Sequence, residues 1–184
     1  MQAKLRRLAP LALALVVFAF APYLARNFFP EELPAAMPSL HAQPLAVPGI
    51  QFKDAAGQTK TLADFRGSYV LLNVWATWCT PCKQEMPSLN ALAANFPPKD
   101  LAIVPMSIDV GGDAAVNRYY RDFKLDRLAI YADPASKAMH ALGVVAIPTT
   151  LLIDRDGKEI ARQIGPAQWD SPAIVEGLGK IVGR

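Results

Sequence analysis

The sequence predicts an α/β fold in which helices cover both faces of a central mixed sheet. From residue 49 onward, short apolar runs of strand length alternate with segments of helical periodicity, which is the pattern of βαβ units. The run Tyr69–Trp75 is almost entirely apolar, as expected for a strand that is buried on both faces. A chain of 184 residues is long enough for one such domain and additional terminal segments.

The predicted domain, residues 49–184, opens with a small leading β-hairpin. An Asp-Ala-Ala-Gly turn separates two short strand-like runs at 50–52 and 59–62. After the central strand, apolar residues recur at steps of three and four over 81–95, which predicts a helix. Pro87 lies inside this helix and should kink it, because proline has no backbone N–H to donate.

The second half of the domain continues the alternation of strands and helices. A strand is predicted at 101–108, although Pro105 leads us to expect a bulge or an edge position, since proline cannot donate to the ladder. The remaining predicted elements are helices at 113–123, 135–142 and 171–182 and strands at 129–131, 149–153 and 159–164. The last two strands form a terminal hairpin, and the complete order of elements predicts the mixed sheet.

Residues 1–27 are predicted to be an N-terminal signal anchor that crosses the membrane once. An apolar run from 8 to 25 is near the shortest length that spans a hydrocarbon core. Lys4, Arg6 and Arg7 precede the run and only Arg26 follows it. The positive-inside rule therefore places the N-terminus in the cytoplasm and the domain outside the membrane.

Cleavage of this segment is an alternative to a permanent anchor. The sequence Ala19-Phe20-Ala21 matches the small-residue pattern of a signal-peptide cleavage site. Pro22 follows directly and disfavours cleavage, so we expect an uncleaved anchor. Residues 28–48 are rich in proline, which predicts an extended, semi-rigid linker between the anchor and the domain.

The net charge of +3 originates in the N-terminal segment. Four of the 19 basic residues flank the apolar run, which leaves 15 in the rest of the chain against 16 acidic residues. A nearly neutral domain without a basic stripe argues against nucleic acid as a partner.

The two cysteines are separated by two residues, in the order Cys79-Thr80-Pro81-Cys82. A structural disulfide stabilises a protein mainly by closing a long loop of the unfolded chain, and this short ring removes little entropy. A zinc site needs about four ligands, and only His41 and His140 are available besides the cysteines. Redox chemistry is the favoured interpretation, with a metal site and a structural bond as alternatives.

The predicted secondary structure assigns different roles to the two cysteines. Cys79 lies between the buried strand and the helix, where unpaired backbone N–H groups and the positive end of the helix dipole favour a thiolate. Its pKa should therefore lie below the free value of about 8.5, which makes it the attacking nucleophile. Cys82, one turn into the helix, would resolve the mixed disulfide.

Residues 74–82, Val-Trp-Ala-Thr-Trp-Cys-Thr-Pro-Cys, resemble the active-site segment of the thioredoxin superfamily. Residues 146–151, Ala-Ile-Pro-Thr-Thr-Leu, resemble the cis-proline loop of that superfamily, whose backbone pairs with a bound substrate strand. The resemblance implies a thioredoxin-like fold, a redox-active Cys79–Cys82 disulfide, and no metal or other cofactor. It also implies substrate-binding residues, namely Trp78, Thr80, Pro81, Ile147 and Pro148. An ordinary trans proline at the start of a strand is the alternative for Pro148.

Within this superfamily, the anchor, the leading hairpin, residues 82–87 and the spacing to Pro148 resemble the exported TlpA/ResA-like group. Residues 165–169 resemble the TlpA branch of that group. The resemblance implies a reductase of protein disulfides on the periplasmic side of a bacterial inner membrane, acting in cytochrome biogenesis. The implied clients are copper-handling proteins of cytochrome oxidase assembly or apocytochrome c, and the implied electron donor is a membrane protein of the DsbD/CcdA type.

Glu85 is the third predicted catalytic residue. Thioredoxins carry a buried aspartate where this chain has Asn73, which cannot exchange a proton. Glu85 matches the glutamate that ResA-like proteins place beneath their cysteines, and the resemblance implies that it handles the proton. The alternative is a solvated glutamate on the helix surface. The segment around Trp169 is interpreted as a packed turn and is left outside the predicted site.

Two other functions remain open at this point. One is an oxidase of the DsbA type, because the direction of exchange depends on the reduction potential. The other is a copper chaperone that holds Cu(I) on Cys79 and Cys82, although no methionine or histidine stands at an obvious spacing for a third ligand.

Overall fold

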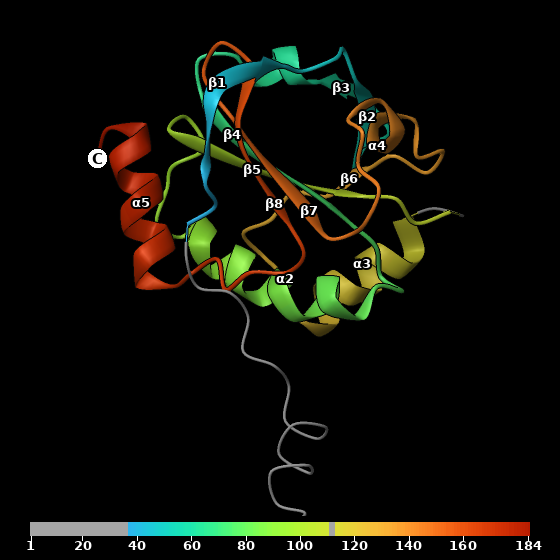
Figure 1. The fold of residues 1–184 in the computed structure, drawn as a ribbon. Helices are drawn as coiled ribbons and strands as arrows, with labels where there is room; N and C mark the ends of the chain where they lie inside the picture. The colour runs from blue at the N-terminus through green and yellow to red at the C-terminus, as the bar shows by residue number, and fades with distance from the viewer. Residues whose placement is uncertain (1–36, 111–112) are drawn as a thin grey trace, which may run out of the picture. The chain divides into compact units, whose positions relative to one another are not determined.

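A mixed sheet of eight strands forms the centre of the part that the computed structural model describes, residues 37–110 and 113–184 (Figure 1). The strand order is β1-β8-β7-β4-β5-β6-β2-β3. The strands are β1 (Leu40–Ala46), β2 (Gln51–Asp54), β3 (Thr59–Thr61), β4 (Tyr69–Trp75), β5 (Leu101–Ser107), β6 (Tyr131–Ala132), β7 (Thr149–Ile153) and β8 (Lys158–Ile164). The helices are η1 (Leu62–Phe65), α2 (Thr80–Ala93), α3 (Asp113–Asp122), α4 (Lys137–Ala141) and α5 (Pro172–Val182).

Strand β4 is the central strand, as its apolar sequence predicts. It pairs in parallel with β5 and antiparallel with β7, and all of its residues except Tyr69 are buried. The β4–β7 register places Asn73 opposite Thr150, and the β4–β5 register places it opposite Pro105. A polar side chain therefore lies in the middle of the sheet, two residues before the strand ends.

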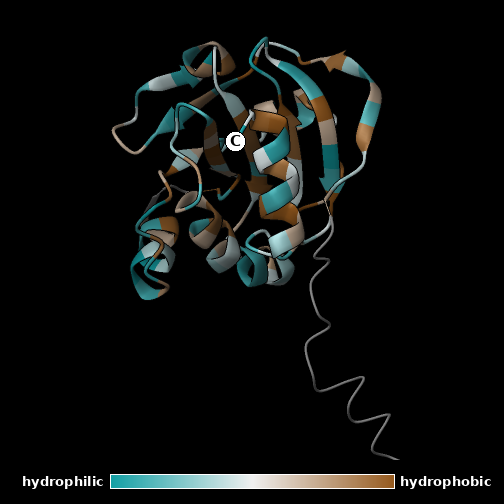
Figure 2. Ribbon diagram, turned by 90° about the vertical axis from the view of Figure 1, so that its left-hand side faces the viewer, coloured by the Kyte–Doolittle hydropathy of each residue, from teal (hydrophilic) through white to brown (hydrophobic). Residues whose placement is uncertain are grey.

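Helices cover both faces of the sheet, as predicted. Figure 1 shows α2 and α3 on one side of the strands and α4 on the other. The C-terminal ends of α2 and α5 lie near each other, since the guanidinium of Arg184, which follows α5, donates to the carbonyl of Asn95, which follows α2. Figure 2 shows that hydrophobic residues are frequent on the central strands and on α5. Burial of this apolar surface is the main favourable term in folding.

Both predicted hairpins are present. Strands β2 and β3 pair antiparallel around the Asp54 to Gly57 turn, and β7 and β8 pair antiparallel around the turn that starts at Asp154. The turn glycines, Gly57 and Gly157, both have φ of 74°, a backbone conformation that favours glycine.

Strand β1 differs from the sequence prediction, which placed residues 28–48 in an extended linker and began the domain at 49. Residues 40–46 instead form an edge strand that pairs antiparallel with β8. Proline is tolerated in an edge strand, and the register shifts between Leu40 and Leu45, around Pro44. The imidazole Nε2 of His41 lies 3.0 Å from the Glu159 carboxylate of β8, which fastens the edge strand to the sheet.

The two prolines expected to disturb the fold are accommodated. The β4–β5 register runs without a shift through Pro105, so the expected bulge is absent there; Pro105 precedes the two residues of β5 that pair with β6. Helix α2 continues through Pro87. A proline removes the donor for the carbonyl four residues earlier, here Lys83. That carbonyl accepts a hydrogen bond of 2.8 Å from the Tyr119 hydroxyl instead.

The predicted anchor, residues 1–27, lies outside the described residues. Among residues 37–110 and 113–184, no helix has the length and apolar character needed to cross a membrane.

Candidate active site

Cys79 and Cys82 form a disulfide at the N-terminus of helix α2. Their sulfurs are 2.09 Å apart and their Cα atoms 5.3 Å apart. Cys79 is the N-cap residue, reached directly from strand β4 through a short turn, whereas Cys82 lies within the first turn of the helix. The exposed fraction is 6% for Cys79 and 0% for Cys82, so a partner can reach only the first sulfur from outside.

The start of α2 provides the stabilisation that a thiolate at Cys79 requires. The backbone N–H of Cys82 donates to Cys79 Sγ over 3.2 Å, and Pro81 occupies the first turn, where a missing N–H has no cost. Helix N-termini also carry a partial positive charge. Both effects favour a negative charge on Cys79, in agreement with its predicted role as the nucleophile.

The loop before β7 places a backbone carbonyl beside Cys79. The Ile147–Pro148 peptide bond is cis, as the resemblance implied. The carbonyl oxygen of Ile147 lies 3.7 Å from Cys79 Sγ. This distance marks a contact and not a hydrogen bond, because a disulfide sulfur carries no hydrogen.

The predicted substrate-binding residues surround the accessible sulfur but differ in exposure. Trp78, next to Cys79 in sequence, is 65% exposed. Thr80 and Pro81 are exposed, Ile147 is half-buried and Pro148 is buried. Val145, two residues before Ile147, is also exposed, which sequence reasoning did not include. Exposed apolar side chains therefore occur both in the segment that precedes Cys79 and in the loop that contacts it.

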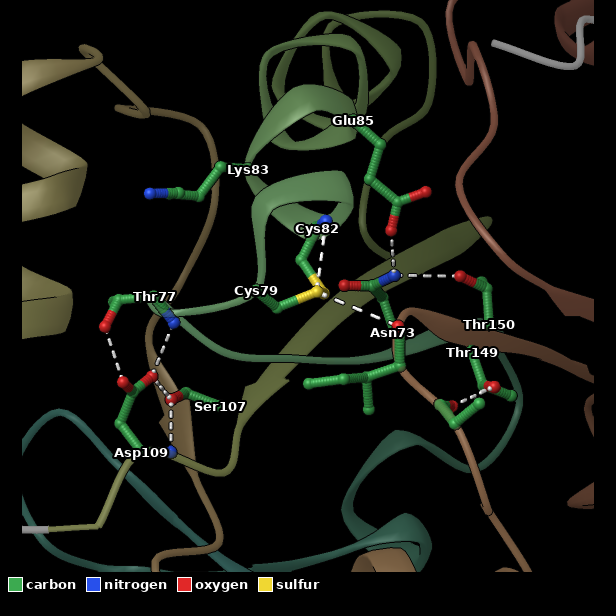
Figure 3. The surroundings of a disulfide bond; sticks show 12 residues. Asn73, Thr77, Cys79, Cys82, Lys83, Glu85, Ser107, Asp109, Thr149 and Thr150 are labelled. Carbon is green, nitrogen blue, oxygen red and sulfur yellow. Dashed lines mark hydrogen bonds between the residues drawn. A yellow bond between two sulfur atoms is a disulfide. The ribbon is translucent and has the colours of Figure 1, made fainter. Parts of the chain in front are cut away.

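Asp109 holds the turn that precedes the cysteines (Figure 3). Its carboxylate accepts hydrogen bonds from the backbone N–H of Thr77 at 2.9 Å and from the Thr77 hydroxyl at 2.5 Å. The Ser107 hydroxyl donates to the same carboxylate over 2.6 Å. The end of β5 therefore positions the segment that leads to Trp78 and Cys79. Sequence reasoning missed this aspartate, because it lies 32 residues from Thr77.

Glu85 is completely buried, which rules out the solvated helix-face interpretation. Its carboxylate accepts three hydrogen bonds, from Asn73 Nδ2 at 2.8 Å, the Ala167 backbone N–H at 2.9 Å and Trp169 Nε1 at 2.9 Å. Burial raises the pKa of this carboxyl from 4.5 to about 7, and the three hydrogen bonds oppose that shift. A carboxyl with a pKa near 7 can gain or lose a proton near neutral pH.

Trp169 is the main residue of this site that sequence reasoning left out. Its indole ring is fully buried and donates to Glu85, and its backbone N–H donates to the Ser88 hydroxyl of α2 at 3.0 Å. The resemblance of residues 165–169 to the TlpA branch was the available signal. The segment does form a turn at residues 169–170, as expected, but the sequence did not reveal the hydrogen bond from the Trp169 side chain to Glu85.

Among residues 37–110 and 113–184, no group of three or more His, Cys, Asp and Glu side chains is arranged to hold a metal ion.

Comparison with known proteins agrees with this geometry. The AhpC/TSA family matches residues 45–161, more than half of the chain. The thiol-disulfide oxidoreductase ResA of Geobacillus thermodenitrificans is 32% identical over 148 residues, covering 79% of each chain. ResA of Bacillus thuringiensis subsp. konkukian is 35% identical over 113 residues; the match covers 61% of this chain and spans 64% of that protein's length.

The structural comparison points to the same group. A crystal structure from Chlorobium tepidum, assigned as the thiol:disulfide interchange protein DsbE, has a TM-score of 0.66 and 27% identity, and the match covers 78% of this chain and 99% of that one. The expected thioredoxin-like fold and the resemblance to ResA-like proteins are thus confirmed. The chain belongs to the AhpC/TSA family of thioredoxin-like proteins.

Proposed function

We propose that the protein is a thiol–disulfide oxidoreductase that reduces disulfides of client proteins on the outer side of a bacterial inner membrane. One observation carries the proposal: a disulfide at a helix N-terminus exposes only Cys79, and the Ile147 carbonyl lies beside that sulfur. The names of the relatives, ResA and DsbE, denote the same class of activity.

The exchange cycle uses both cysteines. The Cys79 thiolate attacks a client disulfide, forms a mixed disulfide and releases one client sulfur. Cys82 then loses its proton and attacks Cys79 Sγ, which forms the Cys79–Cys82 bond and breaks the bond to the client. Two electrons pass to the client, and the two protons lost by the cysteines are taken up by its two sulfurs.

The reducing direction is supported by the surroundings of the cysteines. A strong oxidant such as DsbA gains its potential by stabilising its reduced form, with a nucleophile pKa near 3.5. Here the buried Glu85 lies one turn beyond Cys82, and its negative charge opposes additional thiolate stabilisation. We expect a potential within about 50 mV of the roughly −270 mV of thioredoxin.

The proposed cellular setting rests on the N-terminal sequence and on the resemblance to the TlpA/ResA-like group. Residues 1–27 would anchor the chain in the inner membrane by a single span, with the domain in the periplasm. Electrons would come from a membrane donor of the DsbD/CcdA type. The clients would be copper-handling proteins of cytochrome oxidase assembly or apocytochrome c. A C-terminal reporter fusion that is active only in the cytoplasm would contradict this topology.

Cysteine variants and a redox titration test the proposed activity. Cys79→Ser should abolish exchange with a disulfide-containing client peptide, whereas Cys82→Ser should still attack and accumulate mixed disulfides. Equilibration with a dithiothreitol series gives the potential. A value above about −170 mV would make the protein an oxidase, because the roughly 150 mV gap between thioredoxin and DsbA corresponds to about 7 kcal/mol.

A further inference from the structure

Asn73 carries a buried oxygen without a hydrogen-bond partner. Among the described residues, only two buried side-chain nitrogen or oxygen atoms lack a partner, Asn73 Oδ1 and Trp75 Nε1. Asn73 is completely buried in the central strand β4. An unpaired polar atom in such a position destabilises the fold, so it requires an explanation.

The orientation of the Asn73 amide is determined by its nitrogen. Nδ2 donates to Glu85 Oε1 at 2.8 Å and to Thr150 Oγ1 at 2.8 Å. The ionised Glu85 carboxylate only accepts hydrogen bonds, so it pairs with the amide nitrogen and not with the oxygen. The oxygen is thereby directed away from Glu85.

The Asn73 oxygen is directed toward the redox pair. Figure 3 shows the Asn73 amide between the Glu85 carboxylate and the disulfide, with its nitrogen on the Glu85 side and its oxygen on the side of the sulfurs. Cys82 is the fully buried member of the pair. In the disulfide neither sulfur has a hydrogen to donate, whereas reduction gives Cys82 an S–H group in this dry environment.

We infer that Asn73 is a positioning residue whose Oδ1 accepts a hydrogen bond from the Cys82 thiol when the disulfide is reduced. The inference rests on the proposed function, since it concerns the reduced state of the same pair. Reduction would then satisfy the oxygen that the disulfide state leaves unpaired.

This hydrogen bond gives the two thiols different protonation states. An acceptor for the S–H group favours the neutral thiol, so it raises the pKa of Cys82, while the helix N-terminus lowers that of Cys79. Cys82 stays protonated until it resolves a mixed disulfide.

Two other charged side chains of this region, Lys83 and Asp109, are not directed at the sulfurs. Lys83 points away from the sulfurs in Figure 3, and Asp109 is bound to Thr77. The Glu85 carboxylate accepts hydrogen bonds from Asn73 and from Trp169, so the Asn73 amide is its contact on the side of the cysteines.

The S–H stretching band of Cys82 tests the inference directly. The measurement uses the full chain with Cys79→Ser, so that Cys82 is the only thiol. Asn73→Leu, which has nearly the shape of asparagine, should move the band to the higher frequency of a thiol without an acceptor. It should also raise the thiolate fraction of Cys82 by roughly five- to tenfold at a given pH below its pKa, followed by thiolate absorbance.

Thr150→Val is the matched control, because it removes the second contact of Asn73 Nδ2 and leaves Oδ1 in place. It should leave the S–H band unchanged. A shift equal to that of Asn73→Leu would reveal a general effect on packing and overturn the inference, as would an unmoved band in Asn73→Leu. If Asn73→Leu does not fold, Asn73→Asp decides: its carboxyl oxygen is an acceptor of at least equal strength, so the band should stay in the hydrogen-bonded range or move lower. A band at the frequency of a free thiol in that variant would contradict the inference.

Failure of this inference can be distinguished from failure of the proposed function. The band reports on a contact inside the protein and needs no client. If the band behaves as expected but the protein does not exchange with client disulfides, the proposed function fails and the role of Asn73 in positioning the thiol stands.

Discussion

The indole Nε1 of Trp169 donates a 2.9 Å hydrogen bond to the Glu85 carboxylate, although 84 residues separate the two in the sequence. Both side chains are completely buried. The contact joins the segment before α5 to the helix that carries the cysteines, and it places a neutral donor against the buried acid of the site. The pKa of Glu85 therefore depends on a residue far from the Cys79-Thr80-Pro81-Cys82 motif.

We predict that Trp169→Phe raises the pKa of Glu85 further above 7. The substitution keeps an aromatic ring but removes a donor that favours the ionised carboxylate, and the expected shift is about one unit. Titration of ¹³C-labelled glutamate side chains by NMR measures it. Trp75→Phe is the matched control, since the Trp75 Nε1 has no partner and its loss should leave the Glu85 titration in place.

The stability of the oxidised protein should decrease with pH because of Glu85. The pKa of this carboxyl is higher in the folded state, about 7, than its ordinary value of 4.5, so between these values the folded state binds more protons than the unfolded state. The contribution of Glu85 to the free energy of unfolding is then fully present below about pH 4.5 and is lost as the pH rises through about 7. Denaturant unfolding across this range should show that the wild-type protein loses on the order of 3 kcal/mol relative to Glu85→Gln. Parallel curves for the two proteins would contradict the raised pKa.

Exchange should also respond to Glu85→Gln. A carboxyl that titrates near pH 7 changes its charge within the working range, so its removal should slow exchange and flatten the pH profile near neutrality. Rates of mixed-disulfide resolution at several pH values measure this effect. A profile identical to that of the wild-type protein would give Glu85 a structural role only.

The hydrogen bond from the Tyr119 hydroxyl to the Lys83 carbonyl should replace, in part, the helical hydrogen bond that Pro87 cannot donate. Tyr119→Phe leaves the Lys83 carbonyl without its donor, and the expected loss of stability is about 1–3 kcal/mol. In a Pro87→Ala background, the alanine N–H can bond to that carbonyl, so the same substitution should cost much less. A double-mutant cycle of unfolding free energies tests this. Equal costs in both backgrounds would mean that Tyr119 stabilises the fold only by packing.

The elements that sequence reasoning located are those with strong local signals. Tyr69–Trp75 is a strand because its apolar run is continuous, and the two hairpins are marked by turns with aspartate and glycine. Strand β1 was missed because its proline-containing sequence resembles a linker. It becomes a strand by pairing with β8 and through the contact of His41 with Glu159, which no local pattern reveals.

The sequence by itself determined the fold class and the cysteine pair, and it predicted that Cys79 is the nucleophile. Periodicity and the spacing of Cys79 and Cys82 are local properties. The partial positive charge at a helix N-terminus likewise acts on any residue in that position. Only the tertiary structure decided that Glu85 is buried and that the oxygen of Asn73 is directed toward the sulfurs. Burial and hydrogen bonding depend on groups brought together from distant parts of the chain, such as Trp169 and Thr150, and desolvation by these groups sets the chemistry of a carboxyl.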